Sequence, residues 1–198
     1  MKSNELSLAQ LVAYKSAIKT GSSLPVLTDD QGRNYTARIV TGYQAAFLAN
    51  TENGNLAKAV DSAIVGIRST DKKKLASGVN HLVFAVRVCA DVVATAPTDE
   101  SGRNAAIQGA LWDKKAKAPL YNSEISFRQE QELFRCSGRE LHNAKASTSN
   151  ADDFKEISPV VIRENKDFDI NIITAGSPAA VDMVLVEYQA IEFGLASA

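Results

Sequence analysis

The sequence is poor in the residues from which most catalytic and metal sites are built. It contains two histidines, His81 and His142, and two cysteines, Cys89 and Cys136, among 198 residues. None of them has the short Cys or His spacing of a metal site, and two cysteines are too few for a disulfide scaffold. A cupin-like metal enzyme would need clustered histidine and carboxylate ligands. We therefore expect no enzymatic activity, no catalytic, cofactor-binding or metal-binding residues, and no bound cofactor.

Strong net charge and long apolar runs are also missing. The formal net charge is −1, so the chain has no global basic field with which to hold nucleic acid. No apolar run approaches the ~20 residues of a transmembrane helix, and we expect no membrane span. The first residues, Met1 to Glu5, do not read as the start of a signal peptide. We expect a protein that is made and kept in a cytoplasm.

Three short motifs invite a functional interpretation, and each fails on inspection. Ser16 to Lys19 matches S-x-x-K and Lys19 to Gly21 matches K-T-G, but serine acyl enzymes need these motifs on separate elements, whereas here they share Lys19. Asp167 to Asn171 begins like a calcium loop, but Ile172 stands where glycine is required and Pro178 where the bidentate glutamate belongs. A strand with alternating polar residues explains this segment better. We also interpret His81 as a satisfied core residue and Cys136 as a small buried hydrophobe.

The strongest structural signal lies between Pro159 and Phe193. Phe168, Ile170 and Ile172 alternate with polar residues, which is the period of a β-strand. We predict adjacent antiparallel strands, with a final strand covered on both faces in its first half and a bulge near its middle. Their ranges are 159–163, 168–173 and 181–193, and the bulge is expected at 187–189.

The N-terminal region predicts a helix followed by a hairpin. Leu8, Leu11, Val12 and Ile18 have near-helical spacing over residues 5–19; we expect Asn4 to cap this helix and Gly21 to end it. Residues 1–20 would thus form an amphipathic arm. Two interpretations stay open: the arm belongs to the core of its own domain, or it straps onto a neighbouring subunit. Residues 24–27 and 35–40 predict two strands joined by a turn.

The middle of the chain predicts a helical insertion over residues 55–96. Leu56, Val60, Ile64 and Ile67 form a helical stripe, and Thr70 can cap a second helix. The stretch 81–95 is open between helix and strand, because valine and phenylalanine are dense there. We further expect a loop-rich region with one short element near 105–112, two strands, and an exposed polar loop. The strands are 124–128 and 132–136, and the loop is 143–153.

These expectations together describe one domain, residues 1–198, that is mainly β (α+β): an antiparallel β-sandwich with an N-terminal helix and inserted helices. Two local basic clusters stand out in the neutral chain. The first comprises Arg68, Lys72, Lys73 and Lys74, and the second Lys114, Lys115 and Lys117. We interpret both as solvated faces, with contact to phosphates or an acidic neighbour as the alternative.

The order of these features resembles the single jelly-roll structural proteins of bacteriophages. An apolar strand, a charged turn and an aromatic-led strand follow one another in 157–172; the small-residue loop 175–178 and the long strand 181–193 come next. This likeness covers about residues 121–194. It implies a jelly-roll-like sandwich and a virion structural protein, assembled in the host cytoplasm into a phage capsid or shell. Its partners would be further copies of itself and other virion proteins, with weak genome contact through the basic clusters. The helix at 55–80 departs from a minimal jelly roll.

Self-assembly would place function in surfaces. We expect Leu8, Leu11 and Val12 to pack on a neighbouring subunit, with the strand 181–193 as the rigid frame. The alternative is a non-catalytic binding module, a lectin-like or receptor-contacting β-sandwich. Such a module would show an exposed aromatic cluster at its loop tips, and the sequence has a single tryptophan, Trp112.

Overall fold

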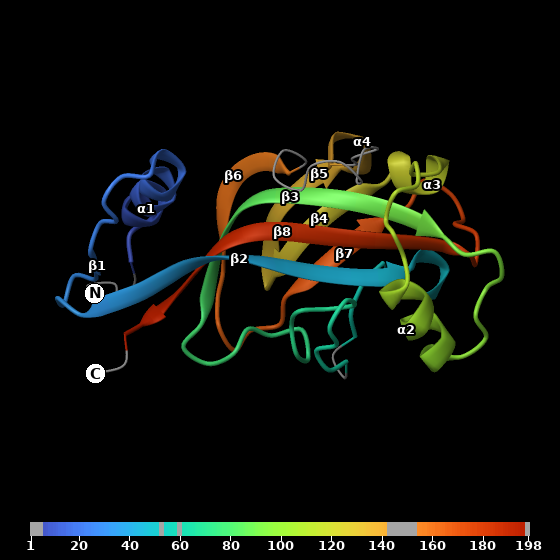
Figure 1. Cartoon of the computed structure of the whole chain (residues 1–198), viewed down its shortest axis with the longest axis horizontal. Coiled ribbons are helices and arrows are strands. Elements are labelled where there is room, and N and C mark those ends of the chain that lie inside the picture. The colour runs from blue at the N-terminus through green and yellow to red at the C-terminus, as the bar shows by residue number, and fades with distance from the viewer. Residues whose placement is uncertain (1–5, 52–53, 59–60, 142–153, 197–198) are drawn as a thin grey trace.

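Two antiparallel sheets pack face to face in the computed structural model, which describes residues 6–51, 54–58, 61–141 and 154–196 (Figure 1). The larger sheet has five strands in the order β1–β2–β8–β3–β6, and the smaller has three in the order β5–β4–β7. The predicted antiparallel β-sandwich is therefore confirmed. The strands are β1 (Leu27–Thr28), β2 (Asn34–Phe47), β3 (Asn80–Val92), β4 (Glu124–Gln129), β5 (Gln131–Ser137), β6 (Lys155–Ile162), β7 (Asp169–Ile173) and β8 (Asp182–Leu195).

Short helices lie around the sandwich. In the view of Figure 1, α1 lies at one end of the long sheet, and α2 lies near its other end. The helical elements are α1 (Leu8–Thr20), the 3-10 turn η1 (Leu48–Asn50), α2 (Glu100–Gln108), α3 (Ala118–Tyr121) and α4 (Gly138–Leu141). The short element expected near 105–112 is thus α2, which begins five residues earlier, where Asp99 accepts a hydrogen bond from the backbone of Gly102.

The chain repeatedly crosses between the two sheets. After β2 it passes to the smaller sheet, where Asn55 forms an isolated bridge with Asn171 of β7, and it then returns to the larger sheet as β3. β4 and β5 form a hairpin in the smaller sheet, β6 lies in the larger, β7 in the smaller, and β8 in the larger. This is the arrangement of an eight-stranded jelly roll in which one strand is reduced to the bridge at Asn55.

The three closing strands are present, but the prediction that they are adjacent is wrong. β6 pairs with β3, β7 pairs with β4, and β8 lies between β2 and β3. The turns 163–168 and 174–181 each carry the chain across the sandwich instead of closing a hairpin. Because the chain crosses between the sheets in this way, the strands of both sheets bury one face in the core between them.

β8 is central and largely buried, as expected for a strand covered on both faces. The predicted bulge at 187–189 is wrong, because β2 and β8 pair without interruption through that region. The irregularity lies opposite, on β3 between Val83 and Ala85, where one extra residue is inserted. A bulge on either partner produces the same shift of register, so the pattern of β8 alone does not locate it.

The predicted helical insertion over 55–96 is wrong for the residues that the structure describes. The part of that segment before β3 forms turns and isolated bridges, and the open stretch 81–95 belongs mainly to β3. Leu56 donates its backbone N–H to Ile170 O (3.0 Å), and Lys72 and Lys73 have positive φ, which no α-helix accommodates. Leu56, Ile67 and Leu75 are nevertheless buried. The apolar stripe therefore marks contact with the sandwich and not a helix.

The N-terminal predictions hold with altered boundaries. α1 is capped by Ser7 and not by Asn4, which lies outside the described residues, and Gly21 ends it with φ +67°. In the hairpin, β1 contains two residues and β2 contains fourteen. The strands predicted at 124–128 and 132–136 are β4 and β5. The polar loop predicted at 143–153 lies outside the described residues.

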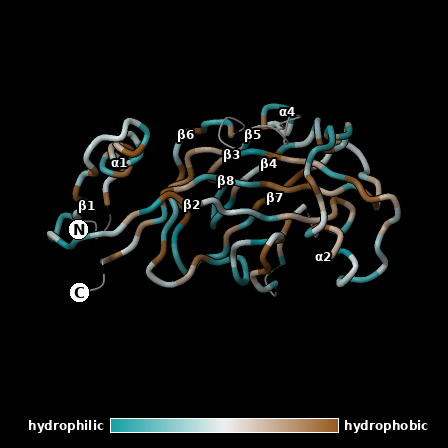
Figure 2. The backbone as a smooth tube through the Cα atoms, viewed as in Figure 1, coloured by the Kyte–Doolittle hydropathy of each residue, from teal (hydrophilic) through white to brown (hydrophobic). Residues whose placement is uncertain are grey.

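Aromatic side chains fill the centre between the two sheets. The rings of Phe127, Phe168 and Tyr188 meet edge to face, with centroids 5.6 to 6.0 Å apart. Tyr188 reaches the edge of this cluster, where its hydroxyl lies 3.3 Å from His81 Nδ1. Figure 2 shows hydrophobic residues recurring along the strands, and hydrophilic ones gathering in the connecting turns. The core therefore lies along the length of the strands.

Candidate interaction surface

One end of the molecule carries α1, β1, the first half of β2 and the end of β8. We call it the terminal lobe and define it as residues 6–41 and 190–196. α1 folds there because Ser7 and Gln10 form a reciprocal capping box and Gly21 closes the last turn. In Figure 1 the lobe extends beyond the smaller sheet. The strands of the larger sheet thus present this end without a second sheet above it.

α1 is docked on its own sheet. Leu11 and Tyr14 are buried in a cluster with Phe84 and Phe193, and Tyr14 donates its hydroxyl hydrogen to Ala37 O (2.6 Å). The ammonium of Lys15 lies 4.4 Å from the centre of the Phe84 ring; Lys15 and Lys19 both pair with Glu156. Of the two interpretations of the arm, its own core is therefore correct for Leu11, and the expectation that Leu11 contacts a neighbour is wrong.

The surface of the terminal lobe is enriched in exposed apolar side chains. Leu8 is 51% exposed and Val12, one turn later, is 42% exposed. Twelve large hydrophobic residues are exposed among the described residues, and seven belong to this lobe, which comprises about a quarter of those residues. The seven are Leu8, Val12, Ile18, Leu24, Val26, Ile39 and Leu195. Such clustering at one end differs from the scattered apolar residues of an ordinary surface.

A groove of about 590 Å³ opens between the start of α1 and the end of the larger sheet. Its walls are largely apolar side chains from both termini, including Leu6, Leu8, Phe193 and Leu195. Charged residues from the hairpin and from the turn after β6 also line it: Arg33, Arg163, Glu164 and Lys166. The groove and the exposed stripe of α1 share Leu8, so they form one continuous surface.

Most of the two basic clusters is neutralised within the chain. In the first, Arg68 pairs with Asp61, Lys73 with Asp169 and Lys74 with Asp167. In the second, Lys114 pairs with Asp113 and Lys117 with Asp182. Lys72 and Lys115 are exposed, and neither forms a salt bridge with a carboxylate of the described residues. Neither cluster therefore presents a concentrated positive surface.

His81 and Cys136, the residues of the sequence with reactive side chains considered above, have structural roles. His81 is buried, and its Nε2 lies 3.5 Å from Glu192 Oε2, which is paired with Arg38. Burial lowers the pKa of His81, against the opposing effect of Glu192. Cys136 is half-buried and donates to Glu140 Oε2 (2.8 Å), and burial together with this carboxylate raises the pKa of the thiol to about 11. Such a thiol is a poor nucleophile at neutral pH.

The residues of the discarded motifs also have ordinary roles. Asp167 and Asp169, from the calcium-like segment, pair with Lys74 and Lys73 of the segment before β3. Within the described ranges, no group of three or more His, Cys, Asp or Glu side chains is arranged to hold a metal ion. Ser16 and Lys19 lie on the exposed side of α1. Sequence reasoning missed the role of Tyr14, although its position three residues after Leu11 places both on one helix face.

No helix among the described residues is long and apolar enough to cross a membrane. Comparison of the chain with known protein families, with curated proteins and with solved structures finds no match.

Proposed function

We propose that this protein is a virion structural protein that self-assembles into the capsid or shell of a bacteriophage, with the terminal lobe as a contact between copies. The observation that carries the proposal is the concentration of exposed apolar side chains in that lobe. A monomer rarely exposes a contiguous apolar patch beyond a few hundred Å², and larger patches commonly mark protein contacts. The jelly-roll order of strands is compatible with this role, since viral capsid domains use it, although lectin domains use it too.

The lobe is suited to a repeated contact. A stable interface buries about 800 Å² on each partner, a small part of the 10513 Å² that the chain exposes. α1 is anchored by Leu11 and Tyr14, so its outward residues Leu8 and Val12 are held in place before any neighbour arrives. Preorganisation of this kind lowers the entropy cost of association. The strand β8 continues from the core into the lobe and supplies the rigid frame.

Two details separate the proposal from its alternatives. Only one of the exposed large hydrophobic residues in the described part is aromatic, Tyr121, so a lectin-like aromatic cluster gains no support. The paired basic clusters give little support to genome contact, and we do not assign them that role. Other virion proteins are further candidate partners for the exposed apolar side chains of the lobe.

The test replaces the exposed stripe and leaves the fold of α1 intact. In the double variant L8E/V12K, glutamate stands in the first turn of the helix and lysine four residues later, a spacing that stabilises an isolated helix. Deleting residues 1–20 is a poorer test, because it would also remove Leu11 and Tyr14 from the core. The matched control is V65E/L111K, which places the same charges on two strongly exposed residues (86% and 78%) outside the lobe.

The measurement is the particle mass by light scattering, with urea unfolding to verify each protomer. We expect the native chain and V65E/L111K to form assemblies of many times 21.2 kDa, and L8E/V12K to remain a folded monomer. A native chain that stays monomeric at every concentration would contradict self-assembly and favour a binding module. If L8E/V12K assembles as the native chain does, the terminal lobe is not the contact.

A further inference from the structure

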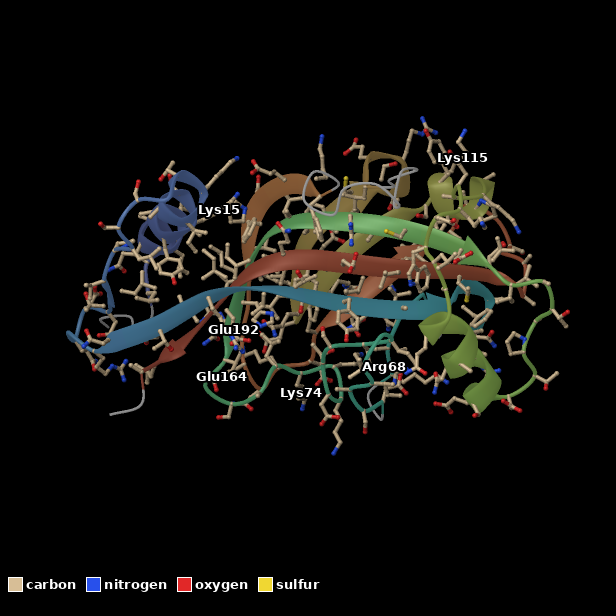
Figure 3. All side chains as sticks on the ribbon, viewed as in Figure 1. Lys15, Arg68, Lys74, Lys115, Glu164 and Glu192 are labelled. Atoms are coloured by element: carbon tan, nitrogen blue, oxygen red, sulfur yellow. The ribbon has the colours of Figure 1, made fainter. Side chains whose placement is uncertain are left out.

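A separate polar cavity lies away from the terminal lobe, between α2 and the segment that follows β2. Its volume is about 230 Å³. Figure 3 shows Arg68 in this region, below β2 and beside α2. The cavity has an apolar back, which includes Phe47 and Ile107. Its polar lining includes Lys58, Asp61, Arg68, Glu100 and Arg103.

Arg68 is the only arginine or lysine among the described residues that is buried, with 8% of its surface exposed. The backbone holds Arg68 in place. Arg68 forms an isolated β-bridge with Gln44 of β2, and the carbonyl of the preceding Ile67 accepts a hydrogen bond from Ala45 N (2.7 Å). Its Nη1 donates to Ser62 O (3.3 Å) and lies 3.4 Å from Asp61 Oδ2. This half of the guanidinium is therefore occupied.

Among the described residues, the Nε side of the Arg68 guanidinium lacks such hydrogen-bond partners. Arg68 Nε is buried and has no hydrogen-bond partner within the part of the chain that the structure describes. A buried donor without a partner costs ~1–3 kcal/mol, and nearly all such groups in native proteins find a protein, water or ion partner. Nε is also closed to solvent, so a ligand in the cavity, which Arg68 lines, supplies the missing acceptor only when the guanidinium turns toward it.

The charge of the cavity selects the kind of ligand. Arg68, Arg103 and Lys58 supply three positive charges, and Asp61 and Glu100 supply two negative ones. Asp61 is already engaged, because it accepts from Lys58 N (2.8 Å) and pairs with Arg68. The amides of Asn50 and Asn104 add neutral donors at the same opening. A small anion in the cavity therefore meets a net charge of +1 and several N–H donors.

We propose that this cavity binds a small tetrahedral oxyanion, with inorganic phosphate as the reference ligand, between the guanidinium groups of Arg68 and Arg103. Arginine suits this role because its planar fork donates two parallel hydrogen bonds to one oxyanion, which the ammonium of lysine does not. The apolar back of the cavity excludes water from one side of the ligand and strengthens these bonds. The site does not depend on self-assembly, since it shares no residue with the terminal lobe.

The experiment titrates inorganic phosphate into the native full-length protein at constant ionic strength, with chloride as the replaced anion. Calorimetry gives the affinity, and the ¹⁵N resonance of Arg68 Nε reports directly on the group that lacks a partner. We expect saturable binding at one site with a shift of that resonance. R103Q should weaken binding at least tenfold, whereas E100Q, which removes a negative charge from the opening, should strengthen it severalfold.

Two further variants complete the design. R68K keeps the charge beside Asp61 but removes the fork, and should also weaken binding at least tenfold; if it fails to fold, R103Q and E100Q on the surface of α2 still decide the question. K115Q is the matched control, because Lys115 is an exposed lysine outside the cavity, and it should bind phosphate as the native protein does. The proposal is overturned by an absence of saturation, by equal affinity of R103Q and K115Q, or by a short oligonucleotide that binds these residues more tightly than phosphate.

Discussion

Gly42 of β2 lies directly opposite Tyr188 of β8, and this pair offers a sharp test of how the two strands are joined. The ring of Tyr188 covers Gly42: a methyl group added there would fall less than 3.0 Å from three atoms of the tyrosine side chain. The ring has little room to yield, because it is fully buried against Phe127 and Phe168. We therefore predict that G42A is destabilising.

The expected magnitude follows from two opposing effects. Alanine in place of glycine within an unobstructed strand stabilises by about 0.5–1 kcal/mol, because the unfolded chain has less freedom to lose. Overpacking a well-filled core costs about 1–3 kcal/mol. With the ring in the way the second effect dominates, and we expect a net loss of about 1–2 kcal/mol. In a chain of this length that loss lowers Tm by roughly 2–8 °C.

Urea unfolding of a double-mutant cycle measures this effect. G42A should cost the same in the native and Y188F backgrounds, because Y188F keeps the ring, and should cost little or nothing in Y188L, where the ring is gone. G109A is the control, since Gly109 has φ −88° and only ordinary contacts. A stabilising G42A, or an equal cost in the Y188L background, would refute this pairing of β2 with β8.

Three further predictions concern single polar groups. E140Q should speed alkylation of Cys136 at pH 8, as followed by mass spectrometry, because the Glu140 carboxylate helps raise the pKa of that thiol to about 11; an unchanged rate would contradict the contact. Burial lowers the pKa of His81 below 6.5, so the unfolded state binds its proton first, and the free energy of unfolding should fall as the pH drops from 6.5 through the lower folded pKa. H81L should lose this component, and an identical pH dependence in both proteins would refute it. D91A should cost about 1–3 kcal/mol and shift the fluorescence of Trp112, because the Asp91 carboxylate accepts from the backbone N–H of Trp112 (3.0 Å) and of the residue before it (2.9 Å); an unchanged spectrum and stability would exclude this role.

Local pattern was sufficient wherever a segment buries one face and pairs its backbone with a regular neighbour. The alternation of Phe168, Ile170 and Ile172 predicted β7, and the polar turn after residue 28 predicted the first hairpin. α1 followed from the spacing of its apolar residues and the glycine at its end. In each case the physical cause acts within a few residues, so it is present in the sequence itself.

The segment before β3 shows where local pattern misleads. Leu56, Ile64 and Ile67 have helical spacing, yet the backbone of Leu56 is engaged by β7 and that of Ile67 by β2. Helical spacing records only that certain side chains are buried. The hydrogen-bond partners that decided the conformation come from strands far away in the chain, and a single-sequence pattern does not contain them.

The candidate sites divide in the same way. The sequence by itself determined that residues 1–20 carry an apolar stripe, but the docking of Leu11 and Tyr14 on the sheet decided that Leu8 and Val12 remain outside. Arg68 looked like one member of an exposed basic cluster, and only the folding of its loop against β2 buried it. Arg103, which lines the same cavity, comes from α2 and lies 35 residues later in the chain. The sequence determined which side chains are apolar or charged, whereas tertiary structure decided which of them face one another, because burial and charge pairing depend on distances between remote segments.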